Sequence, residues 1–206
     1  TVAEKVAAIF ESVVYIPHCI EIEGNIIKVF DPAVHKAVGQ AEKVESSRPS
    51  LRRERSDQRW VACQRPVVVT GGELTMEMLD LKFNEFAKFY EAPLHMKALN
   101  GTFIIDDFGR QRVSPEEILN RWIVPLQTRI DNLTLHSGKA FTIPFDELLI
   151  FSTNLAPDDL MDPAFLRRIP YKLETYEPSM DAFRQIFTAV AAKQGLQLTD
   201  EIFDYV

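Results

Sequence analysis

Two adjacent carboxylates at the end of an apolar segment are the residues of this chain that are best placed to do chemistry. Asp106 and Asp107 directly follow the segment 102–105, Thr-Phe-Ile-Ile, which shows no alternation of polar and apolar side chains. Such a segment is typical of a strand that is covered on both faces in a parallel α/β sheet. Ligands of these sheets bind at the carboxyl ends of the strands, where the two acids lie. The alternative is a strand followed by an ordinary acidic turn, because Asp is common in turns.

A second polar strand end lies further along the chain. The apolar segment 148–151 leads into Ser152, Thr153 and Asn154. We expect this strand to lie beside the first one in the sheet, so that both polar ends face the same crevice. Asn154 carries both a donor and an acceptor, although an Asn at this position could equally end a strand and begin a turn.

Paired arginines are the third candidate. The segment 162–168, Asp-Pro-Ala-Phe-Leu-Arg-Arg, predicts a short helix that ends in Arg167 and Arg168. Taken alone, two arginines at the end of a helix are more often surface charges that stabilise the helix dipole. Their position behind the two polar strand ends favours a functional role.

The order of these three elements resembles the AAA+ family of P-loop ATPases, over residues 100–175. By this resemblance the acidic strand end is the Walker B element, the polar strand end is sensor 1, and the arginines are the finger that reaches the ATP of a neighbouring subunit. The phrase Phe-Leu-Arg-Arg at 165–168 is similar to that of the Clp-type unfoldases, and a hairpin over 133–143 resembles one in the MoxR-type and related branches. The resemblance implies ATP and Mg²⁺ as cofactors and a homo-oligomeric ring, which we expect to be a hexamer.

The resemblance also implies a role for each candidate residue. Asp106 would accept the water ligands of Mg²⁺ at the β- and γ-phosphates, since this hard ion prefers carboxylate oxygen. Asp107 stands where the family usually has Glu, and would orient or deprotonate the attacking water. Asn154 would hold that water and the γ-phosphate. Arg167 or Arg168 would stabilise the transition state in a neighbouring subunit, an effect of roughly 10³- to 10⁵-fold in rate.

Asp107 departs from the usual pattern of the family. It is one methylene shorter than Glu, and misplacing a catalytic group by about 1 Å can lower a rate on the order of 100-fold. ATPases of the DnaA type resemble this chain in carrying two aspartates here. We therefore expect slower hydrolysis, with the activity retained.

The phosphate-binding loop of the family is missing from the sequence. No G-x-x-x-x-G-K-[ST] motif occurs, and the Gly71-Gly72 pair lacks the Lys-Ser/Thr that would follow, so we expect a turn there. That loop ends in a Ser or Thr that opens a helix, and Thr1 precedes a helical pattern. We therefore expect Thr1 to be the last residue of the loop and a ligand of Mg²⁺ and nucleotide; the alternative is that Thr1 is simply an N-cap. Both ends of the chain look cut, so we expect this fragment to be inactive and the full-length protein to hydrolyse ATP.

The elements expected around these candidates follow from periodicity and turn residues. They are a helix with Val2, Val6, Ile9 and Phe10 on one face, strands over 13–22 and 26–30 joined by a turn at 23–25, a strand over 66–69, one or two helices over 74–99, and a hairpin of 133–135 with 140–143. A capping box predicts a helix from Ser114 to about Asp131, kinked at Pro125. A last helix begins at Ser179 and closes at Gly195.

Residues 31–59 are expected to form an exposed insertion loop. Its arginines are Arg48, Arg52, Arg53, Arg55 and Arg59. They could grip a partner or a nucleic-acid backbone, but Glu54 and Asp57 among them equally fit a solvated loop.

Composition excludes several classes of protein. A net charge of −7 over 206 residues argues against a surface devoted to nucleic acid or anionic membrane. No apolar stretch reaches the roughly 18 residues of a membrane span, and no signal-peptide pattern opens the chain, so we expect a cytoplasmic protein without membrane insertion. Cys19 and Cys63 are too isolated for a zinc site or a disulfide framework. The four histidines lack an acid or thiol at ligand spacing and are expected to be structural or surface residues.

These observations predict an α/β, AAA+-type parallel-sheet core over residues 1–175, with the insertion loop 31–59, followed by the beginning of a helical lid over 176–206. We expect the protein to use ATP hydrolysis to remodel a protein or nucleic-acid partner. Two alternatives stay open. One is a catalytically inactive AAA+-like interaction module, and the other is an ATPase that engages DNA through the arginines of residues 48–59.

Overall fold

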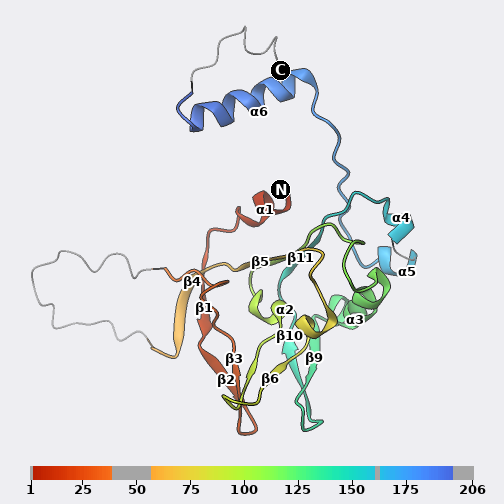
Figure 1. The fold of residues 1–206 in the computed structure, drawn as a ribbon. Coiled ribbons are helices and arrows are strands. Elements are labelled where there is room, and N and C mark those ends of the chain that lie inside the picture. Colours follow the sequence, from red (N-terminus) through yellow and green to blue (C-terminus); the bar gives the residue numbers. More distant parts are fainter. Residues whose placement is uncertain (1, 39–56, 161–162, 197–206) are drawn as a thin grey trace, which may run out of the picture. The chain divides into compact units, whose positions relative to one another are not determined.

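The computed structural model describes residues 2–38, 57–160 and 163–196. The chain divides into two compact units, Thr1–Arg168 and Ile169–Val206, and each is described by itself (Figure 1). The first unit is a mixed α/β structure that contains a parallel sheet, as the sequence predicted.

The parallel sheet consists of β5 (Val67–Thr70), β8 (Thr102–Ile105) and β11 (Leu148–Phe151), in the order β11-β8-β5. All four residues of β8 are buried, because this strand is flanked on both edges and covered on both faces. Pro66 precedes the edge strand β5, where its missing N–H interrupts no ladder hydrogen bond. The strands predicted to end in Asp106 and in Ser152, β8 and β11, lie side by side and parallel, as expected.

Helix α1 (Val2–Ala7) packs on this sheet through its small side chains. Ala3 and Ala7 are buried against Ile104, with Ile150 beside them. The predicted helix is confirmed, but the predicted apolar face was wrong. Its residues Val2, Val6, Ile9 and Phe10 are exposed, and the last two lie beyond the helix. Alanine allows a helix backbone to approach a sheet closely, which hydrophobicity alone does not indicate.

Helix α3 (Pro115–Thr128) begins with the predicted capping box. Ser114 Oγ accepts a hydrogen bond from Glu117 N at 3.2 Å, and a carboxylate oxygen of Glu117 accepts one from Ser114 N, also at 3.2 Å. The helix ends three residues before Asp131, because Arg129 adopts a left-handed conformation (φ 58°) and the next strand begins directly after it. The buried face consists of Ile118, Leu119, Trp122 and Pro125.

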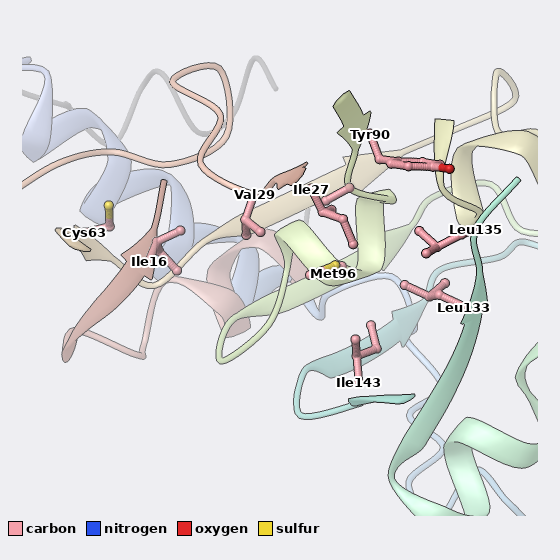
Figure 2. Packing of buried hydrophobic residues seen from close by; sticks show 10 residues of the cluster. Ile16, Ile27, Val29, Cys63, Tyr90, Met96, Leu133, Leu135 and Ile143 are labelled. Carbon is pink, nitrogen blue, oxygen red and sulfur yellow. The ribbon is translucent and has the colours of Figure 1, made fainter. Parts of the chain in front are cut away.

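The remaining strands of the first unit are β1 (Val13–Pro17) paired with β4 (Trp60–Gln64), a sheet in the order β2 (Cys19–Ile22), β3 (Asn25–Lys28), β7 (Phe89–Glu91) and β6 (Lys82–Asn84), and the hairpin of β9 (Ile130–Thr134) and β10 (Ala140–Pro144). They pair antiparallel, except for β3 and β7, which pair in parallel. The predicted hairpins around Gly24 and Gly138 are confirmed. Buried side chains from these strands pack with Met96 in one hydrophobic core, and this shared core holds the strands and α2 (Leu94–Lys97) together (Figure 2).

The segment 74–99 corrects the prediction of one or two long helices. It contains the short 3-10 helix η1 (Met76–Leu79), the hairpin β6–β7 and the single-turn helix α2 (Leu94–Lys97). Asn84 Oδ1 accepts hydrogen bonds from the backbone N–H groups of Phe86 (3.1 Å) and Ala87 (2.9 Å), and Lys88 has a left-handed φ of 57°. The Phe83 and Tyr90 rings then pack across the hairpin, so cross-strand contacts outweigh helix propensity here.

Part of the predicted insertion loop lies outside the described residues. Arg48, Arg52, Arg53 and Arg55 belong to this part. Arg59 is described and exposed, and it pairs with Asp57 at 2.6 Å. Cys19 and Cys63 are free thiols, exposed and buried respectively.

The second unit contains helix α6 (Met180–Lys193), which confirms the helix predicted after Ser179. Ser179 Oγ accepts a hydrogen bond from Ala182 N at 3.3 Å, and Gly195 follows the helix with a φ of 72°. Both are the local signals that the sequence carried for a helix start and end.

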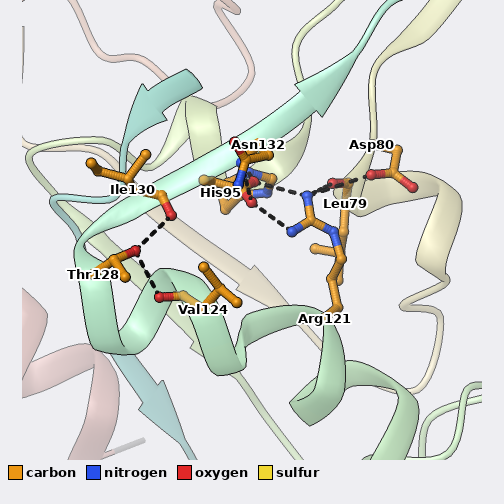
Figure 3. Close-up of polar contacts among 9 residues, drawn as sticks. Leu79, Asp80, His95, Arg121, Val124, Thr128, Ile130 and Asn132 are labelled. Atoms are coloured by element: carbon orange, nitrogen blue, oxygen red, sulfur yellow. Dashed lines mark hydrogen bonds and ion pairs between the residues drawn. The ribbon is translucent and has the colours of Figure 1, made fainter. Parts of the chain in front are cut away.

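A buried charge network joins α2, α3 and β9 (Figure 3). The guanidinium of Arg121 grips Asp131 with two hydrogen bonds, of 2.6 and 2.8 Å, and Asp131 is 1% exposed. His95 Nε2 lies 2.8 Å from the same carboxylate, although its ring N–H is poorly aligned for a hydrogen bond. Burial alone would raise the pKa of Asp131, but the neighbouring His95 and Arg121 outweigh it and hold that pKa at about 2.

Glu147, just before β11, carries the opposite perturbation. Both of its carboxyl oxygens are buried without a hydrogen-bond partner among the described residues. Burial, reinforced by the negative charges of Asp131 and Asp146, raises the pKa of Glu147 from 4.5 to about 8. The folded protein therefore keeps this proton over a pH range in which the unfolded chain loses it.

We expect the free energy of unfolding to fall as the pH rises from 4.5 to about 8, and to level off above that pH. The slope from this one group is up to about 1.4 kcal/mol per pH unit. Glu147→Gln should remove it, because the amide is neutral throughout, whereas Glu116→Gln at an exposed position should leave it in place. Urea denaturation of the three proteins at pH 5, 6, 7 and 8 measures the slope, and equal slopes in Glu147→Gln and wild type would contradict a buried, protonated Glu147.

Candidate functional site

The carboxyl ends of the three parallel strands meet at one edge of the sheet. Thr70, Ile105 and Phe151 are the last residues of their strands, and they pair in register. Asp106 N donates to Thr70 O at 2.8 Å, and Ser152 N donates to Ile105 O at 2.9 Å, so the backbone ladder continues one residue beyond each end. The polar residues that follow these strands therefore lie at the same edge, which is where parallel α/β sheets bind ligands.

The two carboxylates differ in their surroundings. Asp106 is half-buried at the end of the central strand, and Asp107 is exposed with a left-handed φ of 50°. Within the described part of the chain, neither carboxylate forms a hydrogen bond or an ion pair. A half-buried carboxylate without a partner suits a hard cation, because Mg²⁺ in nucleotide sites takes one or two carboxylates and completes its shell with phosphate and water.

Two hydrogen bonds tie the polar end of β11 to the acidic turn, and a third holds the Thr153 hydroxyl within its own segment. Phe108 N donates to Ser152 O at 2.7 Å, Thr153 Oγ1 donates to Phe108 O at 2.8 Å, and Leu155 N donates to Thr153 Oγ1 at 3.1 Å. The hydroxyl of Thr153 is thus used by the structure. Asn154 is exposed, and its side chain has no partner among the described residues, so it keeps a free donor and acceptor.

The Gly71-Gly72 segment directly follows β5, at the same edge of the sheet, and forms a turn, as the sequence predicted. Leu74 N donates to Gly71 O at 3.2 Å, and Gly71 N donates to a Glu73 carboxylate oxygen at 3.0 Å. This backbone hydrogen bond lowers the pKa of Glu73. Arg112 N donates to Gly72 O at 3.3 Å, which links this turn to the one that follows β8.

The paired arginines follow α5 (Pro163–Leu166), which confirms the predicted short helix. Phe165 is buried, and its ring packs edge-on against Phe151, with 6.4 Å between the centroids. The arginine segment is therefore anchored to the last residue of β11. Arg167 is exposed and Arg168 is half-buried.

Thr1, the remaining predicted ligand, lies outside the described residues. Within the described residues, no three His, Cys, Asp or Glu side chains are grouped so as to hold a metal ion. In the same part of the chain, no helix is long and apolar enough to cross a membrane.

The sequence reasoning missed one residue of this site. Gln111 hydrogen-bonds to the backbone of the acidic turn through both ends of its side-chain amide. A glutamine among charged loop residues carries no local signal for such a role, so only the folded turn identifies it.

Comparison with known proteins gives likenesses to solved structures. No family model and no curated protein matches the sequence. The chain is similar to a structure of the complex between subunits BchI and BchD of magnesium chelatase, with a TM-score of 0.49 and 16% identity over 70% of this chain and 44% of that chain. It is also similar to NtrX from Brucella abortus, with a TM-score of 0.43 and 15% identity over 64% of this chain and 32% of that one. A structure of the same NtrX in complex with ATP matches with a TM-score of 0.41 and 16% identity, over 62% and 29% of the two chains. This chain thus spans less than half the length of each of these proteins.

Proposed function

We propose that this chain is part of a P-loop ATPase of the AAA+ type, which hydrolyses ATP in the complete protein. One observation carries the proposal. The acidic end of β8 and the polar end of β11 lie side by side at the carboxyl edge of a parallel sheet, joined by hydrogen bonds from Phe108 and Thr153. The arrangement supports the proposal, because carboxylates and an amide at this edge would be able to hold phosphates and a hydrolytic water together.

Asp106 is the proposed Mg²⁺ ligand. Its backbone is fixed by the hydrogen bond to Thr70 O, and its half-buried carboxylate has no partner among the described residues. Thr1 is proposed as the second protein ligand and as a contact to the nucleotide. The bound ion would neutralise the phosphates, a chemistry that one or two protein oxygens are enough to support.

Asp107 and Asn154 are proposed to act on the attacking water. Asp107 would orient or deprotonate it, and Asn154 would hold it against the γ-phosphate. Both side chains are exposed and without partners in the described structure, so neither has to break a contact to do so. Arg167 and Arg168 are proposed to reach the ATP of a neighbouring subunit in a homo-oligomeric ring, for which we propose a hexamer that remodels a protein or nucleic-acid partner in the cytoplasm.

Asp107→Asn in the complete protein is expected to lower kcat by about 100-fold or more while ATP still binds, because a general base or water-orienting carboxylate contributes roughly 10²- to 10⁴-fold. Asp106→Asn should instead weaken Mg²⁺-dependent ATP binding. Asp146→Asn is the matched control, since this exposed Asp lies at the opposite end of the sheet from the candidate site. Steady-state phosphate release and titration with a fluorescent ATP analogue measure the two effects.

Two outcomes would contradict the proposal. Unchanged turnover in Asp107→Asn would remove its catalytic role. A complete wild-type protein that neither binds nor hydrolyses ATP would favour the inactive interaction module. Binding of DNA that weakens with added salt would support a DNA-engaging ATPase, because phosphate contacts release counterions.

A further inference from the structure

One side chain holds the turn that carries the two carboxylates. Gln111 Oε1 accepts a hydrogen bond from Gly109 N at 2.8 Å. Its Nε2 donates to the backbone oxygen of Asp106 at 2.9 Å and to that of Asp107 at 3.2 Å. The acceptor and both N–H bonds of the half-buried amide are thereby used, all on the backbone of a single turn.

The backbone of this turn has a conformation that its residues do not favour intrinsically. Asp107 has a φ of 50°, a left-handed conformation that is unfavourable for a non-glycine residue and persists where the surroundings impose it. The direction of a Cα–Cβ bond follows the backbone dihedrals. The position of the Asp107 carboxylate therefore depends on whatever keeps this φ in place.

A close contact confines the same turn independently. Gly109 has a φ of 103°, and a Cβ at this position would lie 2.6 Å from Leu160 Cδ2 and 3.1 Å from Leu155 Cδ1. Leu160 belongs to α4 (Pro157–Leu160), so the turn packs against the chain that follows β11. A side chain here would be strained by this φ and would displace the two leucines, and the Gly109 N–H is the group from which Gln111 accepts a hydrogen bond.

Asp106 is fixed in another way. Its N–H donates to Thr70 O at 2.8 Å as an extension of the sheet. Loss of the Gln111 amide would remove the hydrogen bond that the Asp106 carbonyl accepts from it, but the hydrogen bond from Asp106 N to Thr70 O would remain. The two carboxylates therefore differ in how strongly they depend on Gln111.

We infer that Gln111 is a positioning residue of the proposed ATP site, which holds the Asp107 carboxylate in place for the attacking water while Asp106 and its Mg²⁺ are held by the sheet. The inference rests on the proposed ATPase function. It assigns to Gln111 an effect on the chemical step and not on nucleotide binding.

The test uses Gln111→Met and Gln111→Glu in the complete protein. Methionine has a similar length and removes all three hydrogen bonds, whereas glutamate keeps an acceptor for Gly109 N but loses both donors. We expect kcat to fall by about 10- to 100-fold in both variants, as for a catalytic group displaced by about 1 Å, with KM for ATP changed by less than about threefold. Gln127→Met, on the exposed face of α3, is the matched control and should behave as wild type.

Hydrogen exchange separates failure of this inference from failure of the proposed function. Peptides covering residues 106–112 should exchange faster in Gln111→Met than in wild type, at an unchanged thermal midpoint. Wild-type kcat in both variants, or a rise in KM that accounts for the lost activity, would overturn the positioning role. A wild-type protein without ATPase activity would refute the proposed function. In that case, unchanged exchange in Gln111→Met would also refute the idea that Gln111 holds the backbone of this turn. Faster exchange would confirm that Gln111 holds the turn, independently of any ATPase activity.

Discussion

Replacing Arg167 and Arg168 together by alanine is expected to lower the ATP turnover of the assembled, complete protein by about 10³- to 10⁵-fold, the range that an arginine finger supplies to a phosphoryl-transfer transition state. ATP binding should change far less, because the arginines would act on the nucleotide of a neighbouring subunit. Of the two single variants, Arg167→Ala should account for most of the loss, since Arg167 is exposed while Arg168 is half-buried. Steady-state phosphate release measures the effect, at protein concentrations above and below the one at which the protein assembles.

A mixing experiment distinguishes a finger from a residue that serves its own subunit. The double Arg167→Ala/Arg168→Ala protein keeps its carboxylates but has no finger to offer, whereas Asp107→Asn keeps the finger but not the water-orienting carboxylate. Mixed assemblies should recover turnover that neither variant shows alone. In them, the intact carboxylates of the double variant can face the intact arginines of a neighbouring Asp107→Asn subunit. Arg59→Ala is the control, since this exposed side chain pairs with Asp57 on the surface and should leave turnover unchanged. A mixture no more active than its parts would show that the arginines do not act across subunits.

Arg121→Met is expected to lower the free energy of unfolding by about 3–5 kcal/mol at pH 7, the largest stability effect that we predict for this chain. The variant removes both guanidinium hydrogen bonds from the Asp131 carboxylate, which is 1% exposed, and leaves it with the His95 ring and the Asn132 N–H, each at 2.8 Å. A buried charge that loses such a partner is far more costly than a missing surface pair, because burial removes the water that would otherwise solvate it. Urea denaturation of the wild type and the variant gives the difference.

The pH dependence of the same pair provides a second measurement. The wild-type pKa of Asp131, about 2, lies below the ordinary 3.8, so its stabilising effect is complete above about pH 4 and is lost as the pH falls towards 2. Loss of Arg121 should raise this pKa, so that the acid-induced loss begins at a higher pH. Arg112→Met, at an exposed site where only the backbone is hydrogen-bonded to other described residues, should show neither effect. A loss below 1 kcal/mol in Arg121→Met would mean that water or another cation replaces the guanidinium.

Several elements could be predicted because their signals are local. The capping box of Ser114 and Glu117, the glycine turns at Gly24 and Gly138, and the apolar strands that end in Asp106 and Ser152 depend on residues within a few positions of one another. Each signal reflects a backbone preference or a short-range hydrogen bond that forms in almost any surroundings. The neighbouring placement of the two polar strand ends also followed, since parallel strands must share an edge.

Other features could not be predicted, because they depend on contacts between distant segments. The residues of 74–99 suit a helix by spacing, but the pairing of β7 with β3 and the packing of Phe83 on Tyr90 draw them into a hairpin. The apolar face expected for α1 is exposed, and the spacing of apolar residues does not reveal that two alanines lie against the sheet instead. In both cases tertiary packing outweighed a weaker local preference.

The sequence by itself determined the order of chemical groups in this protein: an acidic strand end, a polar strand end and an arginine pair, carried on strands and helices whose local signals are strong. Only the tertiary structure decided which of these groups are free to act. Thr153 is used in a hydrogen bond to Phe108 while Asn154 is not, and Gln111 holds a left-handed Asp107 that no local pattern predicts. The physical reason is that a side chain's identity specifies what it can bind, whereas its partners in the folded chain specify which of those capacities remain unused.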